Sequence, residues 1–202
     1  MRIITFDDVI ETYVKVYHRG FRYLFTKFSL SKNQRTKSTF NSTSVDSANY
    51  WIIPRVRQRW NMLISGDKSI SYEDYVVEKY LNGRNNLSLL SLGSGTCSHE
   101  MIFAKHQCFQ SVKCIDFSEK TLDVAVEEAN ARGLNNMLFE CADVNAFQIP
   151  SKTYDIVLFH SSLHHFRNIS SLLEKVRCGL KSNGLLIVNE YVGPSRLQIT
   201  RK

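Results

Sequence analysis

Long apolar runs, proline and a leader-like start are all scarce or missing in this 202-residue sequence. The longest clean apolar stretches, such as Leu185–Val188, are strand-sized, whereas a membrane-spanning helix needs roughly 18 or more apolar residues in a row. Only 3 residues are proline, and 43% apolar with 22% charged residues is typical of one globular domain, which excludes collagen-like and wholly disordered chains. The start MRIITFDDVIETYVK lacks the basic-then-apolar order of a secretory signal, so we expect a cytoplasmic protein.

Cysteine is present but follows no pattern. The 5 cysteines are scattered and contain no C-x-x-C pair, which favours reduced thiols over a disulfide framework. The closest group with metal-ligand chemistry is His160, His164 and His165, and no cysteine or carboxylate stands near it at a matching spacing. We therefore expect no metal site.

The formal charge of +7 is concentrated in the first part of the chain. Residues 1–84 hold 14 Lys and Arg against 8 Asp and Glu, while residues 85–202 hold 12 against 11. Residues 15–37 carry seven of these bases and no acid, a composition that suits phosphates. They adjoin a polar stretch instead of a formed groove, and no base-reading motif accompanies them. The sequence therefore disfavours nucleic acid as a partner.

Residues 1–30 have the pattern of a basic amphipathic helix. Apolar residues recur every three or four positions from Phe6 to Phe28. This stripe either packs on the rest of the protein, which we favour, or makes peripheral contact with a membrane through residues 5–28. Residues 31–49 are rich in Ser, Thr and Asn, which predicts a flexible polar linker.

The rest of the chain predicts a helical segment followed by a layered domain. Residues 50–84 contain two helical patterns and are predicted to form a small lid or platform. From residue 85 to residue 202, short apolar runs alternate with helical stretches, which is typical of a parallel sheet covered on both faces. The predicted helices are Arg55–Ile64, Tyr72–Leu81, Ser98–His106, Glu119–Ala131 and Ile169–Leu180, and the predicted strands are Leu87–Leu92, Val112–Ile115, Met137–Phe139, Ile156–Phe159 and Leu185–Val188.

A glycine-rich turn and a carboxylate follow the first two predicted strands. Gly93 and Gly95 let a ligand approach the backbone closely, and the start of the next helix adds free N–H groups. Asp116 ends the second strand, 23 residues after Gly93, where a carboxylate is placed to accept hydrogen bonds from ribose hydroxyls. Asp116 or Ser118 can equally cap the following helix, and the two roles are compatible.

A second acidic residue follows the third predicted strand. Asp143 lies between Ala142 and Val144, in the segment CADVNAF. Its carboxylate is either an ordinary turn residue or an acceptor for the amino group of adenine, with the two apolar neighbours providing surface for the ring. Its place at the end of a third successive strand favours the second interpretation.

The chain resembles the class I S-adenosylmethionine-dependent methyltransferases over about residues 85–193. Five blocks in the family's order carry the resemblance: LLSLGSGTCSHE, KCIDFSEKTLDVAVEEANARGL, CADVNAF, YDIVLFHSSLHHF and LKSNGLLIVNEYVG. It implies an α/β, Rossmann-like, doubly wound and mostly parallel sheet of strand order 3-2-1-4-5 with an N-terminal helical extension, and S-adenosylmethionine as cofactor. The implied cofactor-binding residues are Gly93, Ser94, Gly95, Asp116, Phe117, Ala142, Asp143, Val144 and His160.

Three features depart from the family pattern. Ser91 stands where many members have an acidic residue that helps hold the cofactor's ammonium group, and Glu100 is a candidate to supply that charge. Cys97 replaces the third glycine of the turn. Strands six and seven of the family are missing, which predicts C-terminal truncation, an unusual minimal domain, or an open edge covered by a partner, a second copy or the N-terminal helix.

The loop after the fourth strand is predicted to meet the methyl acceptor. The Asn-Pro-Pro-Tyr signature of adenine and exocyclic-amine methylases is absent there, whereas histidine suits proton removal from a hydroxyl or a carbon acid. His164 and His165 are candidate bases or acceptor-orienting residues, and His160 is expected in the same cleft. Helix capping and packing are the alternative roles. Glu190, at the end of the fifth strand, is a candidate to shape the acceptor pocket, and Arg55 on the lid suits an acidic acceptor.

The function that these residues favour is methyl transfer from S-adenosylmethionine to a small-molecule or glycan-like acceptor. A non-catalytic nucleotide- or partner-binding domain of the same fold is the first alternative, because the motif departures weaken the case for catalysis. An NAD-dependent oxidoreductase is the second, since it shares the glycine turn and the ribose carboxylate.

Overall fold

A computed structural model of the protein describes residues 9–10, 13–14, 16–17 and 53–190. The chain divides into two compact units, residues 1–48 and 49–202. In the first unit the described residues are helical, and the rings of Tyr13 and Tyr17 stack with their centroids 6.5 Å apart. The remainder of the predicted helix 1–30 and the linker 31–49 lie outside the described residues.

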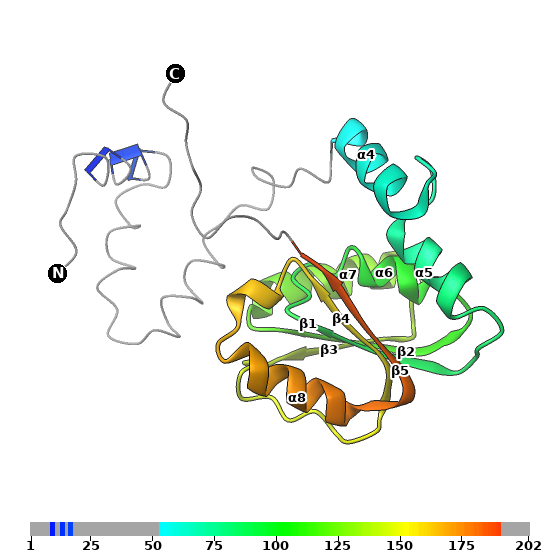
Figure 1. The fold of residues 1–202 in the computed structure, drawn as a ribbon. Helices are drawn as coiled ribbons and strands as arrows, with labels where there is room; N and C mark the ends of the chain where they lie inside the picture. Colours follow the sequence, from blue (N-terminus) through cyan, green and yellow to red (C-terminus); the bar gives the residue numbers. More distant parts are fainter. Residues whose placement is uncertain (1–8, 11–12, 15, 18–52, 191–202) are drawn as a thin grey trace. The chain divides into compact units, whose positions relative to one another are not determined.

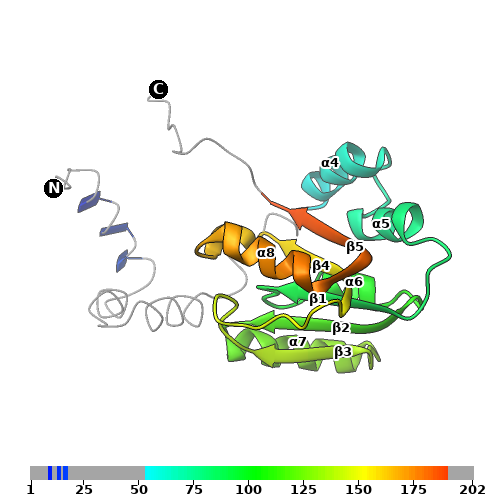
Figure 2. The ribbon, with the colours of Figure 1, turned by 60° about the horizontal axis from the view of Figure 1, so that its bottom comes forward.

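The second unit is built on a five-stranded sheet of order β3-β2-β1-β4-β5. Every adjacent pair of these strands is parallel, so all carboxyl ends lie at one edge of the sheet (Figures 1 and 2). The predicted α/β fold and strand order are therefore confirmed. The strands are β1 (Leu87–Leu92), β2 (Phe109–Asp116), β3 (Met137–Cys141), β4 (Tyr154–His160) and β5 (Leu180–Asn189).

Helices cover both faces of the sheet, as Figure 1 shows. The helices α5 (Tyr72–Tyr80), α6 (Glu100–Ala104) and α7 (Glu119–Ala131) pack on one face, and α8 (Ile169–Gly179) packs on the other. Successive strand residues alternate between these layers: Leu89 belongs to the core beneath α5–α7 and Leu90 to the core beneath α8. Burial on both faces explains why the central strands are continuous apolar runs.

The helices before the sheet form where the sequence predicts them. The helix α4 (Pro54–Ser65) ends before Gly66, and α5 begins at Tyr72 after Ser71, whose hydroxyl accepts a hydrogen bond from the Asp74 amide at 3.1 Å. In contrast, α6 has only 5 residues and is shorter than the predicted Ser98–His106. Residues 53–190 contain no helix that is long and apolar enough to cross a membrane.

The last described strand differs from its prediction at its start. The predicted strand is Leu185–Val188, but Asn183 and Gly184 already lie inside β5, which begins directly where α8 ends. An irregularity in the pairing with β4 accommodates them, since Tyr154 pairs with Leu180 and Ile156 already pairs with Leu185. Among residues 53–190 no strand pairs with the outer edge of β5.

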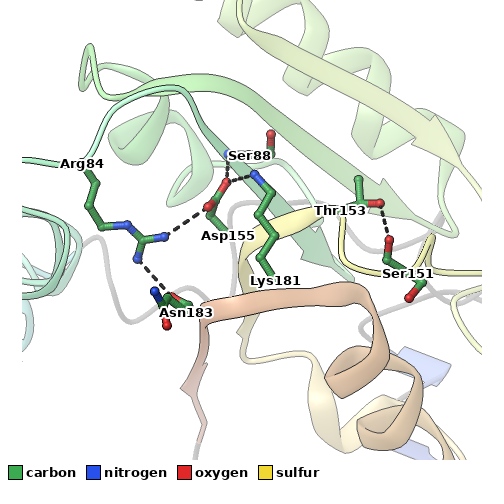
Figure 3. Close-up of polar contacts among 7 residues, drawn as sticks. All are labelled: Arg84, Ser88, Ser151, Thr153, Asp155, Lys181 and Asn183. Carbon is green, nitrogen blue, oxygen red and sulfur yellow. Dashed lines mark hydrogen bonds and ion pairs between the residues drawn. The ribbon is translucent and has the colours of Figure 1, made fainter.

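A buried carboxylate joins three strands at the opposite, amino-terminal edge. Asp155 at the start of β4 accepts hydrogen bonds from the Ser88 amide at 2.9 Å and from Lys181 Nζ at 2.7 Å, and it pairs with Arg84 at 3.1 Å (Figure 3). Arg84 also donates to the carbonyl oxygen of Asn183 at 3.2 Å. The cluster ties the starts of β1, β4 and β5 together and lies away from the candidate site.

Candidate cofactor and acceptor site

The glycine turn is attached to the end of β2. The amides of Gly93 and Ser94 both donate to the carbonyl oxygen of Ile115, at 2.8 and 3.1 Å. Gly93 and Gly95 have φ angles of 77° and 55°, in the left-handed region that favours glycine. The predicted close turn between β1 and α6 is therefore present.

The surroundings of Gly93 and Gly95 differ. A Cβ atom at Gly93 would lie 2.8 Å from Ser162 Cβ and 3.0 Å from Phe166 Cζ, so the loop after β4 packs directly on this residue. A Cβ atom at Gly95 would meet nothing within 4 Å. Packing therefore requires the first glycine, whereas the second faces open space in which a ligand can approach the backbone.

Cys97, which stands where the family pattern has its third glycine, has a left-handed backbone conformation. Its φ is 57°, its side chain is buried, and its amide donates to the Ser94 carbonyl oxygen at 2.9 Å. A left-handed conformation costs a non-glycine residue about 1–2 kcal/mol. The buried side chain and the hydrogen bond to Ser94 hold Cys97 in this conformation.

Asp116, the last residue of β2, joins the turn to the next helix. Its Oδ2 accepts a hydrogen bond from the Gly95 amide at 2.8 Å, and its Oδ1 accepts one from the Ser118 amide at 2.8 Å. The Ser118 hydroxyl in turn caps α7 by accepting from the Thr121 amide at 3.4 Å. A carboxylate can accept about four hydrogen bonds, so Asp116 retains capacity for ribose hydroxyls.

Residues 142–144, which follow β3, lie at the same carboxyl edge of the sheet as Asp116. The Ala142 amide donates to the Asp116 carbonyl oxygen at 2.9 Å, and Val144 is buried in the core beneath α8. Asp143 Oδ1 accepts from the backbone and side-chain nitrogens of Asn145 at 2.9 and 2.8 Å, which is the geometry of a turn residue. Phe117 is half-buried next to Asp116, and its carbonyl oxygen accepts from the Cys141 thiol at 3.6 Å.

The carboxylate of Glu100 contacts Ser91 on β1, the position at which the family pattern has an acidic residue. Its Oε1 accepts a hydrogen bond from the Ser91 hydroxyl at 2.5 Å, and its side chain is buried. Burial raises the pKa of Glu100, and the hydrogen bond from Ser91 opposes that shift. Ser91, which departs from the family pattern, is therefore in direct contact with the residue predicted to compensate for it.

His160 lies in a network that the sequence analysis missed. Its Nδ1 is 2.9 Å from the Tyr72 hydroxyl, and its ring stacks on His99 with the centroids 3.5 Å apart. His99 Nδ1 is 2.5 Å from Oε1 of Glu73, which is buried. Burial, followed by the charge of His99, lowers the pKa of His160 to about 3, so this imidazole is neutral near pH 7. The sequence analysis did not predict Tyr72, Glu73 and His99, because the first two lie in α5, His99 directly precedes α6, and the three form no local motif.

The other two predicted histidines lie on the loop after β4, in the short 3-10 helix η2 (Leu163–His165). Their rings are 4.0 Å apart. His164 Nδ1 lies 2.9 Å from Oε2 of Glu190, and the side chain of His164 is 55% exposed. Partial burial, then the charge of His164, lowers the pKa of His165, while the negative charges of Glu190 and Asp116 oppose the shift.

The structure thus gathers the predicted residues at one edge of the sheet. The glycine turn, Asp116 and the 142–144 segment are linked to each other by hydrogen bonds at the ends of β1, β2 and β3. The histidine loop lies at the end of β4 and contacts the turn through Gly93. Comparison with known proteins shows which family has this arrangement.

A family model described as a methyltransferase domain matches residues 84–200. The chain belongs to this methyltransferase-domain family. The match includes all five strands and the glycine turn, while α4 and α5 precede it. It favours a methyltransferase over the nicotinamide-dependent alternative.

Curated relatives match about half of this methyltransferase-domain chain. The YafE protein of Escherichia coli is 30% identical over 101 residues, which are 50% of this chain and 49% of that protein. (S)-Coclaurine N-methyltransferase of Thalictrum flavum is 29% identical over 101 residues, 50% of this chain and 28% of that enzyme. The chain therefore spans about half or less of the length of these relatives.

Solved structures show the same methyltransferase fold. A SAM-dependent methyltransferase from Aquifex aeolicus aligns with a TM-score of 0.54 at 17% identity, covering 76% of this chain and 79% of that one. The YcgJ protein of Bacillus subtilis aligns with a TM-score of 0.53 at 21% identity, covering 59% of this chain and 50% of that one. At these identities the likeness shows the fold alone.

S-Adenosylmethionine, on which the Aquifex aeolicus methyltransferase depends by its name, fits the residues at this edge. The open space at Gly95 admits a ligand to the backbone, and Asp116 retains acceptor capacity beside it. Glu100 supplies a carboxylate near the end of β1, where the family places one.

Proposed function

We propose that this methyltransferase domain binds S-adenosylmethionine across the ends of β1, β2 and β3 and transfers its methyl group to a small-molecule or glycan-like acceptor. The observation that supports the proposal is the hydrogen bond from the Gly95 amide to Asp116 Oδ2 at 2.8 Å, because it joins the open turn to the carboxylate that we propose for ribose. Bound cofactor would supply an electrophilic methyl group on sulfur.

Each part of the edge has a proposed role toward the cofactor. Gly93, Ser94 and Gly95 line the methionine and ribose end, and Asp116 accepts from the ribose hydroxyls beside Phe117. Asp143, with Ala142 and Val144, receives adenine, for which Oδ2 of Asp143 is available because it has no partner among residues 53–190. Glu100 is placed to receive the ammonium group.

The acceptor is proposed to approach the ends of β4 and β5. His164 and His165 lie there, and methyl transfer from a sulfonium needs alignment of donor and acceptor together with removal of a proton from a hydroxyl acceptor. His160 is a weaker candidate for a base, because its low pKa of about 3 and its contact with Tyr72 favour a packing role. We propose that residues 50–84, which include α4 and α5, form a lid or platform.

We also propose two contacts with partners: one at the outer edge of β5 and one with a membrane. The outer edge of β5 exposes Leu186 and Val188 to 43% and 44%, which suits a covering partner or a second copy of the chain. Membrane contact through residues 5–28 rests on the sequence pattern alone.

Isothermal titration calorimetry with three ligands tests the proposal. We expect S-adenosylmethionine and its demethylated product, S-adenosylhomocysteine, to bind folded protein, and NAD to bind far more weakly. Binding of both ligands without methyl transfer to any of a panel of hydroxyl acceptors would favour the non-catalytic binding domain. No heat from either ligand, or tighter binding of NAD, would contradict the cofactor assignment.

A further inference from the structure

The carboxylate of Glu190 is held in place by the backbone of the histidine loop. Glu190 directly follows β5, and its side chain is only 9% exposed. Its Oε1 accepts a hydrogen bond from the Leu163 amide at 2.5 Å, which fixes the carboxylate at the start of η2. The second oxygen is therefore presented in a defined direction.

That second oxygen contacts the imidazole of His164. Glu190 Oε2 lies 2.9 Å from His164 Nδ1. An ionised carboxylate only accepts hydrogen bonds, so the proton of the neutral imidazole must lie on Nδ1. The other ring nitrogen, Nε2, then carries a lone pair that can accept a proton.

The position of His164 matches that of the methyl acceptor in the proposed function. The proposed cofactor site occupies the β3-β2-β1 side of the sheet, whereas Glu190 and His164 belong to the ends of β5 and β4. His164 is also 55% exposed, so its ring is accessible from solvent.

From this geometry we infer that Glu190 is a positioning residue that holds His164 in the Nδ1–H tautomer, and that His164 Nε2 is the base for a hydroxyl acceptor. The inference rests on the proposed function. In the step, the acceptor oxygen bonds to the methyl carbon, the C–S electron pair stays on sulfur to give S-adenosylhomocysteine, and the hydroxyl proton moves to His164 Nε2. Glu190 stays ionised and stabilises the imidazolium that forms.

Nitrogen-15 NMR of the imidazole rings tests the inference without a known acceptor. At about pH 8.5, well above the ordinary histidine pKa of about 6.5, two-bond proton–nitrogen correlations report which ring nitrogen carries the proton. We expect the Nδ1–H tautomer for His164 in the unmodified protein. A predominant Nε2–H tautomer for His164 would overturn the inference without requiring any variant.

The Glu190→Gln variant keeps the shape of the side chain but replaces one acceptor oxygen with an NH₂ donor. The substituted side-chain oxygen can still accept from the Leu163 amide, while its NH₂ group faces His164 Nδ1 and donates to it. We therefore expect the variant to fold and to shift His164 to the Nε2–H tautomer, which removes the lone pair from the acceptor side. The control is Glu174→Gln, which removes the same charge from an exposed pair with Arg177 and should leave the His164 tautomer unchanged.

Cofactor binding separates failure of this inference from failure of the proposed function. Glu190→Gln should leave the affinity for S-adenosylhomocysteine within about twofold of the unmodified protein, since Glu190 lies outside the cofactor residues. For any hydroxyl acceptor that the unmodified protein methylates, Glu190→Gln should lower kcat about 10²-fold with little change in KM. An unchanged tautomer in the variant contradicts the role of Glu190, whereas loss of cofactor binding in the unmodified protein contradicts the proposed function.

Discussion

Asp116 already has structural contacts before any ligand binds. Its carboxylate joins the Gly95 amide to the Ser118 amide, so it supports both the turn and the start of α7. The spacing from Gly93 predicted its place at the end of β2, and the helix-capping alternative was partly right because Ser118 is the cap. Its role toward ribose stays a prediction, and it rests on the acceptor capacity that the carboxylate retains.

Replacing Asp116 tests the ribose assignment. Asp116→Ala should weaken the binding of S-adenosylhomocysteine by about 1–3 kcal/mol, because ribose hydroxyls would lose their acceptor in a partly desolvated site. Calorimetry gives the affinity, and thermal unfolding checks that the variant is folded. The control is Asp123→Ala on the exposed face of α7, which removes the same charge. Equal affinity of the Asp116 variant and the unmodified protein would show that the assignment is wrong.

Gly179 gives a prediction about packing instead of ligand binding. A Cβ atom at this last residue of α8 would lie 2.3 Å from Cγ2 of Ile149. Gly179→Ala should therefore lower the free energy of unfolding by about 1–3 kcal/mol through overpacking. Urea denaturation measures the change, with Cys178→Ala at the adjacent exposed position as the control. A variant as stable as the control would mean that Ile149 moves aside without cost.

At the scale of elements, the sequence predicted which segments are strands and helices better than where they end. The predicted strand Val112–Ile115 extends to Phe109–Asp116 because ladder hydrogen bonds are made by the backbone and continue past the apolar residues. The predicted strand Leu185–Val188 starts too late, because pairing with β4 begins at Leu180 and continues through an irregularity. Contacts between elements, such as Tyr72 with His160 across 88 positions, leave no periodic signal in the sequence.

The start of α5 offers a test at this scale, since that helix carries Tyr72 and Glu73. The Ser71 hydroxyl accepts from the Asp74 amide at 3.1 Å and donates to Asp74 Oδ2 at 2.7 Å. Ser71→Ala should lower the free energy of unfolding by about 1 kcal/mol, whereas Ser71→Asn should retain most of it because Asn is also a good N-cap residue. Denaturant unfolding of both variants measures this. Equal losses in the two variants would argue against a capping role.

At the scale of the whole molecule, the two edges of the sheet have different chemistry. The carboxyl edge gathers the glycine turn, Asp116 and the histidine loop, whereas the amino edge holds the ion cluster around Asp155. The parallel arrangement, which the alternating strands and helices predicted, is what brings residues far apart in the sequence to one edge. The cluster around Asp155 was not predicted, because Arg84, Asp155 and Lys181 lack any local pattern.

The Asp155 cluster predicts how stability depends on pH. Burial alone would raise the pKa of Asp155, but the hydrogen bonds from Lys181 and Ser88 and the charge of Arg84 outweigh it and lower the pKa. A carboxylate with a lowered folded-state pKa stabilises the fold above its unfolded pKa of about 3.9, and this contribution is lost as the pH falls through the folded pKa.

A variant isolates this contribution from those of other acids. Asp155→Asn should lower the free energy of unfolding by about 1–2 kcal/mol at pH 7, because it keeps an acceptor for Ser88 but loses the charge. The difference from the unmodified protein should shrink as the pH falls below about 4. Urea denaturation across this pH range measures both. A difference that stays constant with pH would contradict the electrostatic explanation.

Amide chemical-shift mapping with S-adenosylhomocysteine is the most direct test of a cofactor site at the carboxyl edge of the sheet, because it shows where the ligand lies. We expect saturating ligand to shift the amide signals of four residues at the carboxyl edge: Gly95, Asp116, Ala142 and Asp143. The signals of Ser88, Asp155 and Lys181 at the amino edge should stay in place. Shifts confined to the amino edge, or none at saturating ligand, would contradict a cofactor site across the ends of β1, β2 and β3.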